Sequence, residues 1–313
     1  MAKVVINKEK CKEVAALMRD FSFEHPEAKK GFQDSEKELF YLFIVVGICH
    51  QINWNFLVQA LKKIREQFLS KFTPEYMQNV SDEEVFGWLA DYPKKWRLGK
   101  RFKRGELVRD MCGELVQKYE GKVENVLKKS GNRMGNDNGL YSLLKDFQAY
   151  GEDPLCKKSA VFIDLIYRFG LWNFSDWENY IPPIDYQIVR IALRNGVISV
   201  EDSELFEKLK NNLPATQEND IAIRSAVIDA LKEISASSGK HTKDLQGFYW
   251  AIGRECCDPD NPSCVFCENP NCSVSAYMNI NCGRKCPFVS VCTAREDEKL
   301  LKIREHNFET TFY

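Results

Sequence analysis

The chain has 313 residues, of which 44% are hydrophobic and 28% are charged, so it can bury a substantial core and is not intrinsically disordered. Its formal net charge of −1 gives no overall attraction to polyanions, so any nucleic-acid binding must come from a local basic patch. The apolar run at 39–49 is too short to cross a bilayer, and charged residues stand where a secretory signal would be apolar. We therefore expect a cytoplasmic, monomeric protein that does not enter a membrane.

Apolar residues three and four positions apart run through most of the first 255 residues, which predicts amphipathic helices rather than strands. The segment that begins at Glu36 is apolar on nearly all sides and predicts a helix buried at the centre of a lobe. Proline, glycine and polar stretches separate the segments. Helices are expected at 8–21, 36–50, 54–72, 82–91, 104–119, 122–129, 157–169, 185–195, 203–211, 220–238 and 242–254.

This pattern predicts an all-α, bilobal fold that ends in a cysteine-rich metal loop. One helical lobe is expected over 38–170. The second lobe is expected to combine 1–37 with 171–255. The cysteine-rich loop then covers 256–292, and a C-terminal tail covers 293–313.

Eight of the twelve cysteines fall between Cys256 and Cys292, which indicates a local site. Because the rest of the chain is large and poor in cysteine, metal ligation is a better interpretation than disulfide bonds. Four thiolates at short spacings can hold a [4Fe–4S] cluster or a zinc ion. Two sets of spacings are present: C-x6-C-x2-C-x4-C from Cys257, Cys264, Cys267 and Cys272, and C-x3-C-x5-C from Cys282, Cys286 and Cys292.

The segment Trp250-Ala-Ile-Gly-Arg-Glu-Cys-Cys257, followed by Cys264, resembles the entry to the iron–sulfur loop of endonuclease III and the MutY-type adenine glycosylases. Cys286-Pro-Phe-Val-Ser-Val-Cys292 resembles the closing C-P-L-x3-C of that loop. The resemblance implies a [4Fe–4S] cluster on Cys257, Cys264, Cys286 and Cys292, with an insertion at 265–285. The other clustered cysteines, Cys256, Cys267, Cys272 and Cys282, are then spare thiols, alternative ligands or a second site. A structural zinc site remains the alternative cofactor.

Glycosidic-bond cleavage passes through an oxocarbenium-like state, which favours a carboxylate beside the sugar and a water or amine nucleophile. The segment leading to Lys158-Ser-Ala160 resembles the G-x-K-T-A segment of the helix-hairpin-helix glycosylases, which places Lys158 at the lyase lysine. Ile181-Pro-Pro-Ile-Asp185-Tyr-Gln-Ile-Val-Arg190 resembles their V-D-x-H-x-x-R, which places Asp185 at the catalytic carboxylate. A solvated helix start at Lys158 and an ordinary helix cap at Asp185 are the alternatives.

Three further features bear on nucleic-acid binding. The family's glycine-rich hairpin, which grips DNA phosphates, is replaced here by a longer segment at 149–155. The run from Gly47 to Trp54 resembles the S-A-Q-x-T-D segment of endonuclease III, which implies that Gln51 fills the gap left by an extruded base. His50, Asn53 and Trp54 are candidates for a base pocket, with core packing as the alternative for Trp54.

The stretch 94–109 carries eight positive side chains against one carboxylate, with Trp96 and Phe102 interleaved. This composition is typical of phosphate binding, and it is equally consistent with a solvated face balanced by acidic residues elsewhere. Lys100, Arg101 and Arg104 are the candidates that we name for contact with phosphates.

A second resemblance covers the run from Ile184 to Ile198 and the run Asn219-Asp-Ile-Ala-Ile-Arg224-Ser-Ala226. These resemble segments of the queuosine-salvage glycosidases, which are distant members of the same superfamily and lack the cysteine loop. Both resemblances imply an enzyme that cleaves an N-glycosidic bond with Asp185. We expect a DNA-base glycosylase, with AP-lyase activity if Lys158 is a nucleophile. The alternatives are a queuosine-like nucleoside or nucleotide N-glycosidase and a non-catalytic nucleic-acid-binding module, so the expected partner is DNA or a nucleotide-type small molecule.

Overall fold

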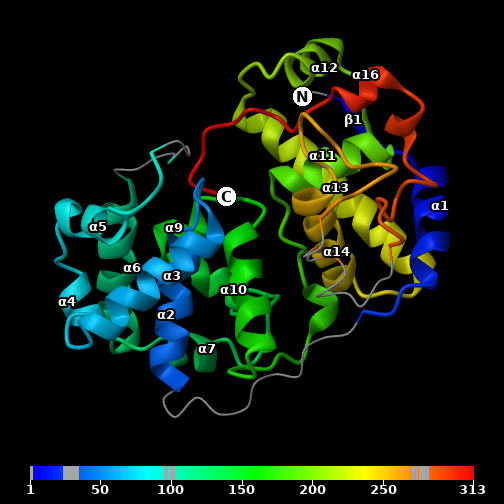
Figure 1. Ribbon diagram of the computed structural model, residues 1–313. Coiled ribbons are helices and arrows are strands. Elements are labelled where there is room, and N and C mark those ends of the chain that lie inside the picture. Colours follow the sequence, from blue (N-terminus) through cyan, green and yellow to red (C-terminus); the bar gives the residue numbers. More distant parts are fainter. Residues whose placement is uncertain are drawn as a thin grey trace. The chain divides into compact units, whose positions relative to one another are not determined.

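The computed structural model describes residues 3–23, 35–94, 98, 103–269, 272, 274 and 282–313. The chain forms two compact units (Figure 1). Unit 1 contains Met1–Pro26 and Pro182–Phe308, and unit 2 contains Glu27–Ile181 and Glu309–Tyr313. Within the described ranges, no helix is both long enough and apolar enough to cross a membrane.

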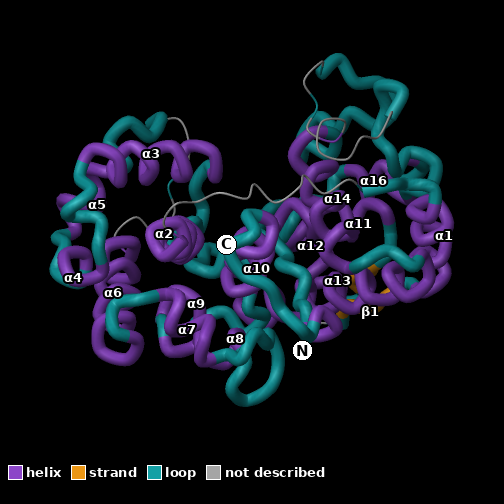
Figure 2. Tube along the Cα trace, turned by 90° about the horizontal axis from the view of Figure 1, so that it is seen from below, coloured by secondary structure: helices purple, strands orange, loops and turns teal. Residues whose placement is uncertain are grey.

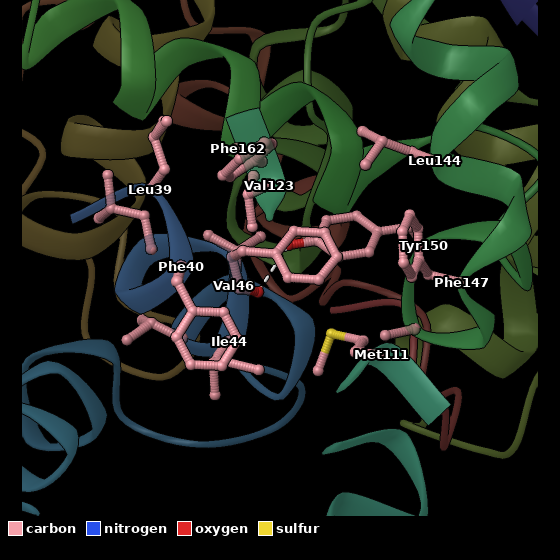
Figure 3. Packing of buried hydrophobic residues seen from close by; sticks show 14 of the residues in the cluster. Leu39, Phe40, Ile44, Val46, Met111, Val123, Leu144, Phe147, Tyr150 and Phe162 are labelled. Carbon is pink, nitrogen blue, oxygen red and sulfur yellow. Dashed lines mark hydrogen bonds between the residues drawn. The ribbon is translucent and has the colours of Figure 1, made fainter. Parts of the chain in front are cut away.

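Unit 2 is built around α2 (Ser35–Gly47), in which every residue from Leu39 onward is buried. A helix without a polar face is stable only where neighbours cover all its sides, and α3, α6, α7 and α10 do so here. Figure 3 shows Leu39, Phe40, Ile44 and Val46 of α2 among the side chains of Met111, Phe147, Tyr150 and Phe162. The other helices of this unit are α3 (Trp54–Gln67), α4 (Pro74–Met77), α5 (Asp82–Trp88), α6 (Lys103–Tyr119), α7 (Val123–Lys129), α8 (Leu140–Leu143), η1 (Leu144–Asp146), α9 (Gln148–Gly151), α10 (Lys157–Arg168) and η2 (Trp177–Asn179).

Unit 1 is centred on the long helix α13 (Gln217–Ser238), which packs against α1, α11 and α14. Its N-terminus is closed by a capping box in which Thr216 and Asn219 satisfy each other's backbone N–H groups. Two short antiparallel strands lie beside this helix, with Val4 opposite Val200 (Figure 2). The elements of this unit are β1 (Val4–Ile6), α1 (Lys8–Arg19), α11 (Tyr186–Asn195), β2 (Ile198–Val200), α12 (Ser203–Lys210), α13, α14 (Thr242–Glu255), η3 (Thr293–Arg295) and α16 (Glu298–Leu301).

The predicted helical fold class is confirmed, with two differences in detail. The strand pair β1–β2 was not expected, because each strand is only three residues long. The first boundary falls after Pro26 rather than after 37, 309–313 belongs to unit 2 rather than to a separate tail, and the units divide between Ile181 and Pro182 rather than at 170. The reason is local, since Phe174 and Tyr180 are buried in the core of unit 2 and Asp176 accepts the N–H groups of Met134 and Gly135.

Candidate functional site

Asp185 is the N-cap of α11 and is only 9% exposed. Its Oδ1 atom accepts the backbone N–H groups of Gln187 at 3.0 Å and Ile188 at 3.1 Å. These donors belong to the first turn of a helix, where the N–H groups have no partner within the helix and the dipole favours a negative charge. The carboxylate is therefore held in one position at the start of α11; its predicted catalytic role remains a prediction.

The cysteine loop is attached to this same helix. Arg190 donates from Nε to the carbonyl of Cys257 at 2.7 Å, and Arg194 donates from Nη1 to the Cys257 thiol at 3.4 Å. Burial raises the pKa of the Cys257 thiol, and the charge of Arg194 opposes that rise. Neither arginine was predicted as a site residue. The signal was present, because two charged residues four positions apart interrupt the apolar face of a predicted helix.

The four cysteines favoured as cluster ligands line one small pocket. The ends of the 265–285 insertion pair through their backbones, since the Cys286 N–H donates to the Cys264 carbonyl at 3.0 Å and the Cys267 N–H donates to the Arg284 carbonyl at 2.8 Å. This pairing returns Cys286 to the side of Cys264, so the insertion does not separate these two cysteines in space. The cavity is lined by Cys257, Cys264, Cys286 and Cys292, together with Cys256 and Arg194.

The thiol set can be compared with what a single ion and a cluster each require. Among the residues that the structure describes, no three His, Cys, Asp or Glu side chains lie close enough together to surround one metal ion. A [4Fe–4S] cluster instead places each of its four thiolates on a different iron, so its ligands surround a volume. Four soft donors around one cavity match that requirement.

The remaining clustered thiols lie nearby. Cys256 is buried and hydrogen-bonds to Cys286, and its pKa is raised by that bond, by burial and by the neighbouring Cys272 and Cys267. Within the insertion, Cys267 and Cys272 are buried whereas Val265 and Phe266 are 67% and 58% exposed. In this part of the loop, these two cysteines are therefore more buried than the two apolar residues beside them.

Lys158, the predicted lyase lysine, lies in unit 2 at the start of α10 and is 1% exposed. Its ammonium donates to the carbonyl of Gly47 at 2.5 Å. Burial lowers its pKa to about 8, and the nearby charges of Lys157 and Arg104 act in the same direction. Lys158 and Asp185 belong to different units, so their joint action remains a prediction.

Arg104 is placed differently from the expectation. It is completely buried, it donates to the carbonyl of His50, and burial lowers its pKa to about 10. A fully buried guanidinium is not presented to the phosphates of a duplex, so Arg104 is not the exposed phosphate contact that the basic stretch predicted. Lys100 and Arg101 lie outside the described residues.

The other predicted base-binding residues follow the end of α2. His50 is buried, and Gln51 adopts a left-handed φ of 45° while its N–H donates to the carbonyl of Tyr313 at 3.1 Å. Asn53 is the N-cap of α3 and accepts the Phe56 N–H, and Trp54 packs partly buried against the core of unit 2. Asn53 therefore caps a helix and Trp54 contributes to packing. The left-handed backbone of Gln51 is a strained conformation of the kind that clusters at functional sites.

The comparisons with known proteins decide the family. The family model described as queuosine salvage protein matches residues 21–252. The chain belongs to the queuosine salvage protein family. The matched region contains α11 with Asp185, and it ends before Cys256, so the cysteine loop lies beyond the part that the queuosine salvage model describes.

Among solved structures, the chain is similar to endonuclease III trapped as a covalent intermediate with DNA in an estranged-adenine complex. The two are 17% identical, the alignment covers 87% of this chain and 96% of that chain, and the TM-score is 0.45. This similarity is too low to carry an argument about function. No curated protein matches the sequence.

A second group of buried charges was also not predicted. Asp220 and Arg224, four residues apart on α13, form an ion pair at 2.8 Å with no exposed surface, and His306 lies 2.7 Å from Asp220. The only sequence signal was the four-residue spacing in the Asn219–Ala226 segment. These contacts join the C-terminal segment to the central helix of unit 1.

Proposed function

We propose that the protein is an N-glycosidase that releases the base from a queuosine-like nucleoside or nucleotide. The observation that carries this proposal is the match to the queuosine salvage family over residues 21–252, which include Asp185. The coarser function, cleavage of an N-glycosidic bond, is what both sequence resemblances imply. The near-neutral charge and the absence of a glycine-rich hairpin at 149–155 favour a small substrate over duplex DNA.

In this reaction the bond between the sugar and the base breaks, and the electron pair leaves with the base. Positive charge then develops on the sugar, where the carboxylate of Asp185 stabilises it. The same carboxylate orients a water molecule and takes its proton as the oxygen bonds to the anomeric carbon. The held position of Asp185, fixed by the N–H groups of Gln187 and Ile188, supports such a role because no reorganisation is needed.

The test measures free base by chromatography and mass spectrometry after incubation with queuosine and with its 5′-monophosphate. Asp185→Asn should reduce base release at least about a hundredfold, because the amide keeps the cap but loses the charge. The matched control is Asp202→Asn, since Asp202 is also an N-cap aspartate in unit 1 and accepts the Leu205 N–H. Wild-type activity in Asp185→Asn, or no release of base by the wild type, would contradict the proposal.

The second candidate is a DNA-base glycosylase with lyase activity, and the observation that favours it is Lys158. Because burial lowers its pKa to about 8, more of this amine is neutral at physiological pH than in an exposed lysine. Borohydride should then trap a covalent adduct with DNA containing a damaged or abasic site. The adduct should disappear in Lys158→Ala and persist in Lys157→Ala, and an adduct that persists in Lys158→Ala excludes this lysine.

For the cofactor, we propose a [4Fe–4S] cluster on Cys257, Cys264, Cys286 and Cys292. The shared cavity and the backbone pairing of Cys264 with Cys286 support this choice. When bound, the cluster would cross-link the loop. The chain's own contribution is the set of thiolates and the guanidinium of Arg194, which offsets part of their negative charge. Zinc on the same thiols is the alternative.

A further inference from the structure

The helix that begins at Asp185 also carries two buried arginines. Arg190 is 3% exposed and Arg194 is 1% exposed, and both belong to α11. A buried guanidinium is costly unless all of its donors are satisfied. The groups that accept hydrogen bonds from these two side chains must therefore keep their positions if α11 is to keep its own.

Their partners come from the entry to the cysteine loop and from the C-terminal segment. Arg190 donates to Cys257 O at 2.7 Å, Gly253 O at 3.0 Å and Glu305 Oε2 at 2.6 Å. Arg194 donates to Asp258 O at 2.8 Å, Pro259 O at 2.7 Å, Ile303 O at 3.0 Å and the Cys257 thiol at 3.4 Å. Every guanidinium nitrogen of both residues is engaged, and five of the seven bonds go to residues 253–259.

The segments on either side of the cysteine loop also touch both ends of the helix. At the start, a Cβ on Gly253 would lie 2.8 Å from the Cβ of Gln187, whose N–H donates to Asp185. At the end, Thr293 Oγ1 donates to the Asn195 carbonyl at 3.0 Å. The cysteine loop and the segments on either side of it therefore contact α11 along its length, and a shift of the 253–259 segment would move the donors that hold the Asp185 carboxylate.

We propose that Arg190 and Arg194 are positioning residues through which the cysteine loop sets the position of Asp185. The position of the 253–259 segment then affects the rate of base release through the place at which α11 holds the Asp185 carboxylate. This inference rests on the proposed role of Asp185 for its effect on activity. The structural coupling itself does not depend on that role.

Hydrogen exchange of the purified full-length protein, measured by mass spectrometry, tests the structural coupling independently of the proposed role of Asp185 in activity. The N–H groups of Gln187 and Ile188 report directly on their bonds to Asp185. In Arg194→Lys the planar fork is lost while the charge remains, and we expect exchange at 186–189 and at 253–259 to rise about tenfold. Exchange in α13 should stay unchanged, which excludes general unfolding. Arg190→Lys is the second variant with the same expectation.

The control is Arg19→Lys, because Arg19 also donates to a backbone carbonyl in unit 1, that of Ser237, but lies on the surface and away from α11. It should alter neither region. In base-release kinetics, Arg194→Lys should lower kcat about tenfold with KM changed less than about twofold.

The coupling is overturned if exchange rises at 253–259 in both lysine variants while 186–189 remains protected, or if neither region changes. If the wild type releases no base, the proposed function fails, and the exchange measurements still decide the coupling. If exchange behaves as expected but kcat is unchanged, the loop holds the helix without controlling the reaction, and the inference about activity is wrong.

Discussion

The ammonium of Lys158 donates a hydrogen bond of 2.5 Å to the main-chain carbonyl of Gly47. This bond links the start of α10 to the end of α2. Burial lowers the pKa of this lysine from 10.5 to about 8. Between pH 8 and pH 10.5, Lys158 is therefore protonated in the unfolded chain but largely neutral in the folded protein. The buried charge opposes folding most strongly below pH 8, the pKa of Lys158 in the folded protein. Below pH 8 the full cost is present, about 3 kcal/mol for this shift, and it is relieved as the pH rises toward 10.5.

The first prediction concerns this pH dependence. Lys158→Met removes the buried charge, so the free energy of unfolding at pH 7 should rise by about 1–2 kcal/mol, since part of the gain is offset by the lost bond to Gly47. The difference between wild type and variant should shrink between pH 8 and pH 10. Urea unfolding at several pH values measures it. Lys157→Met serves as the neighbouring control, and a difference that is independent of pH would contradict the assignment.

The second prediction concerns Gly47 itself. A Cβ at this position would collide with the thioether of Met111, which is completely buried, and would lie 3.5 Å from Ala149. Gly47→Ala should therefore destabilise the protein by about 1–3 kcal/mol through overpacking. Gly113→Ala is the matched control on α6, because nothing lies within 4 Å of its Cβ position. That variant should gain about 0.5–1 kcal/mol from helix propensity, and thermal unfolding of both distinguishes packing from propensity.

The third prediction concerns the buried carboxylate of Asp220. Burial opposes its ionisation, but the hydrogen bonds from His306 and Arg224 prevail and lower its pKa. A lowered carboxyl pKa contributes stability at pH values above the unfolded value of 3.8, and this contribution is lost as the pH falls through the folded value. Asp220→Asn leaves Arg224 buried without its counter-charge and should cost about 3–5 kcal/mol at pH 7. Asp229→Asn, on the exposed side of the same helix, should change the unfolding free energy by less than about 0.5 kcal/mol.

Much of the helical framework could be predicted from the sequence because the apolar spacing is regular. The end of α3 shows the limit, since a helix was expected to reach Phe72 but ends at Gln67. The missed elements are short. β1 and β2 have three residues each and are defined by pairing with each other, and such pairing over a long sequence separation leaves no local period to detect.

Site residues that a local sequence pattern marks could be predicted, whereas those defined by a contact with a distant residue could not. Asp185 at a helix start and the clustered cysteines are visible in the sequence. The burial of Arg104 was not, because its basic neighbours suggested a surface and only the folded chain places the His50 carbonyl against it. Arg190 and Arg194 were missed because their partners lie at least 63 residues away along the chain.

The last prediction concerns which cysteines bind the metal. If Cys257, Cys264, Cys286 and Cys292 hold a [4Fe–4S] cluster, anaerobically purified protein should be brown and contain about four irons per chain. Replacing any of these four by serine should abolish the visible absorbance and most of the iron. Cys112→Ser, in the core of unit 2, should leave both unchanged.

The iron content of serine variants at the other clustered cysteines tests whether the ligands come from the contiguous set that begins at Cys257 or from both ends of the loop. Cys272→Ser should retain iron if the insertion carries no ligand, because Cys286 is returned to the side of Cys264 by the backbone pairing at the ends of the insertion. Loss of iron in Cys267→Ser and Cys272→Ser, with retention in Cys286→Ser and Cys292→Ser, would instead assign the contiguous set that begins at Cys257. About one zinc per chain and no iron would establish the zinc alternative. In each case removal of the metal should raise hydrogen exchange at 253–259, because the thiolates would no longer be cross-linked.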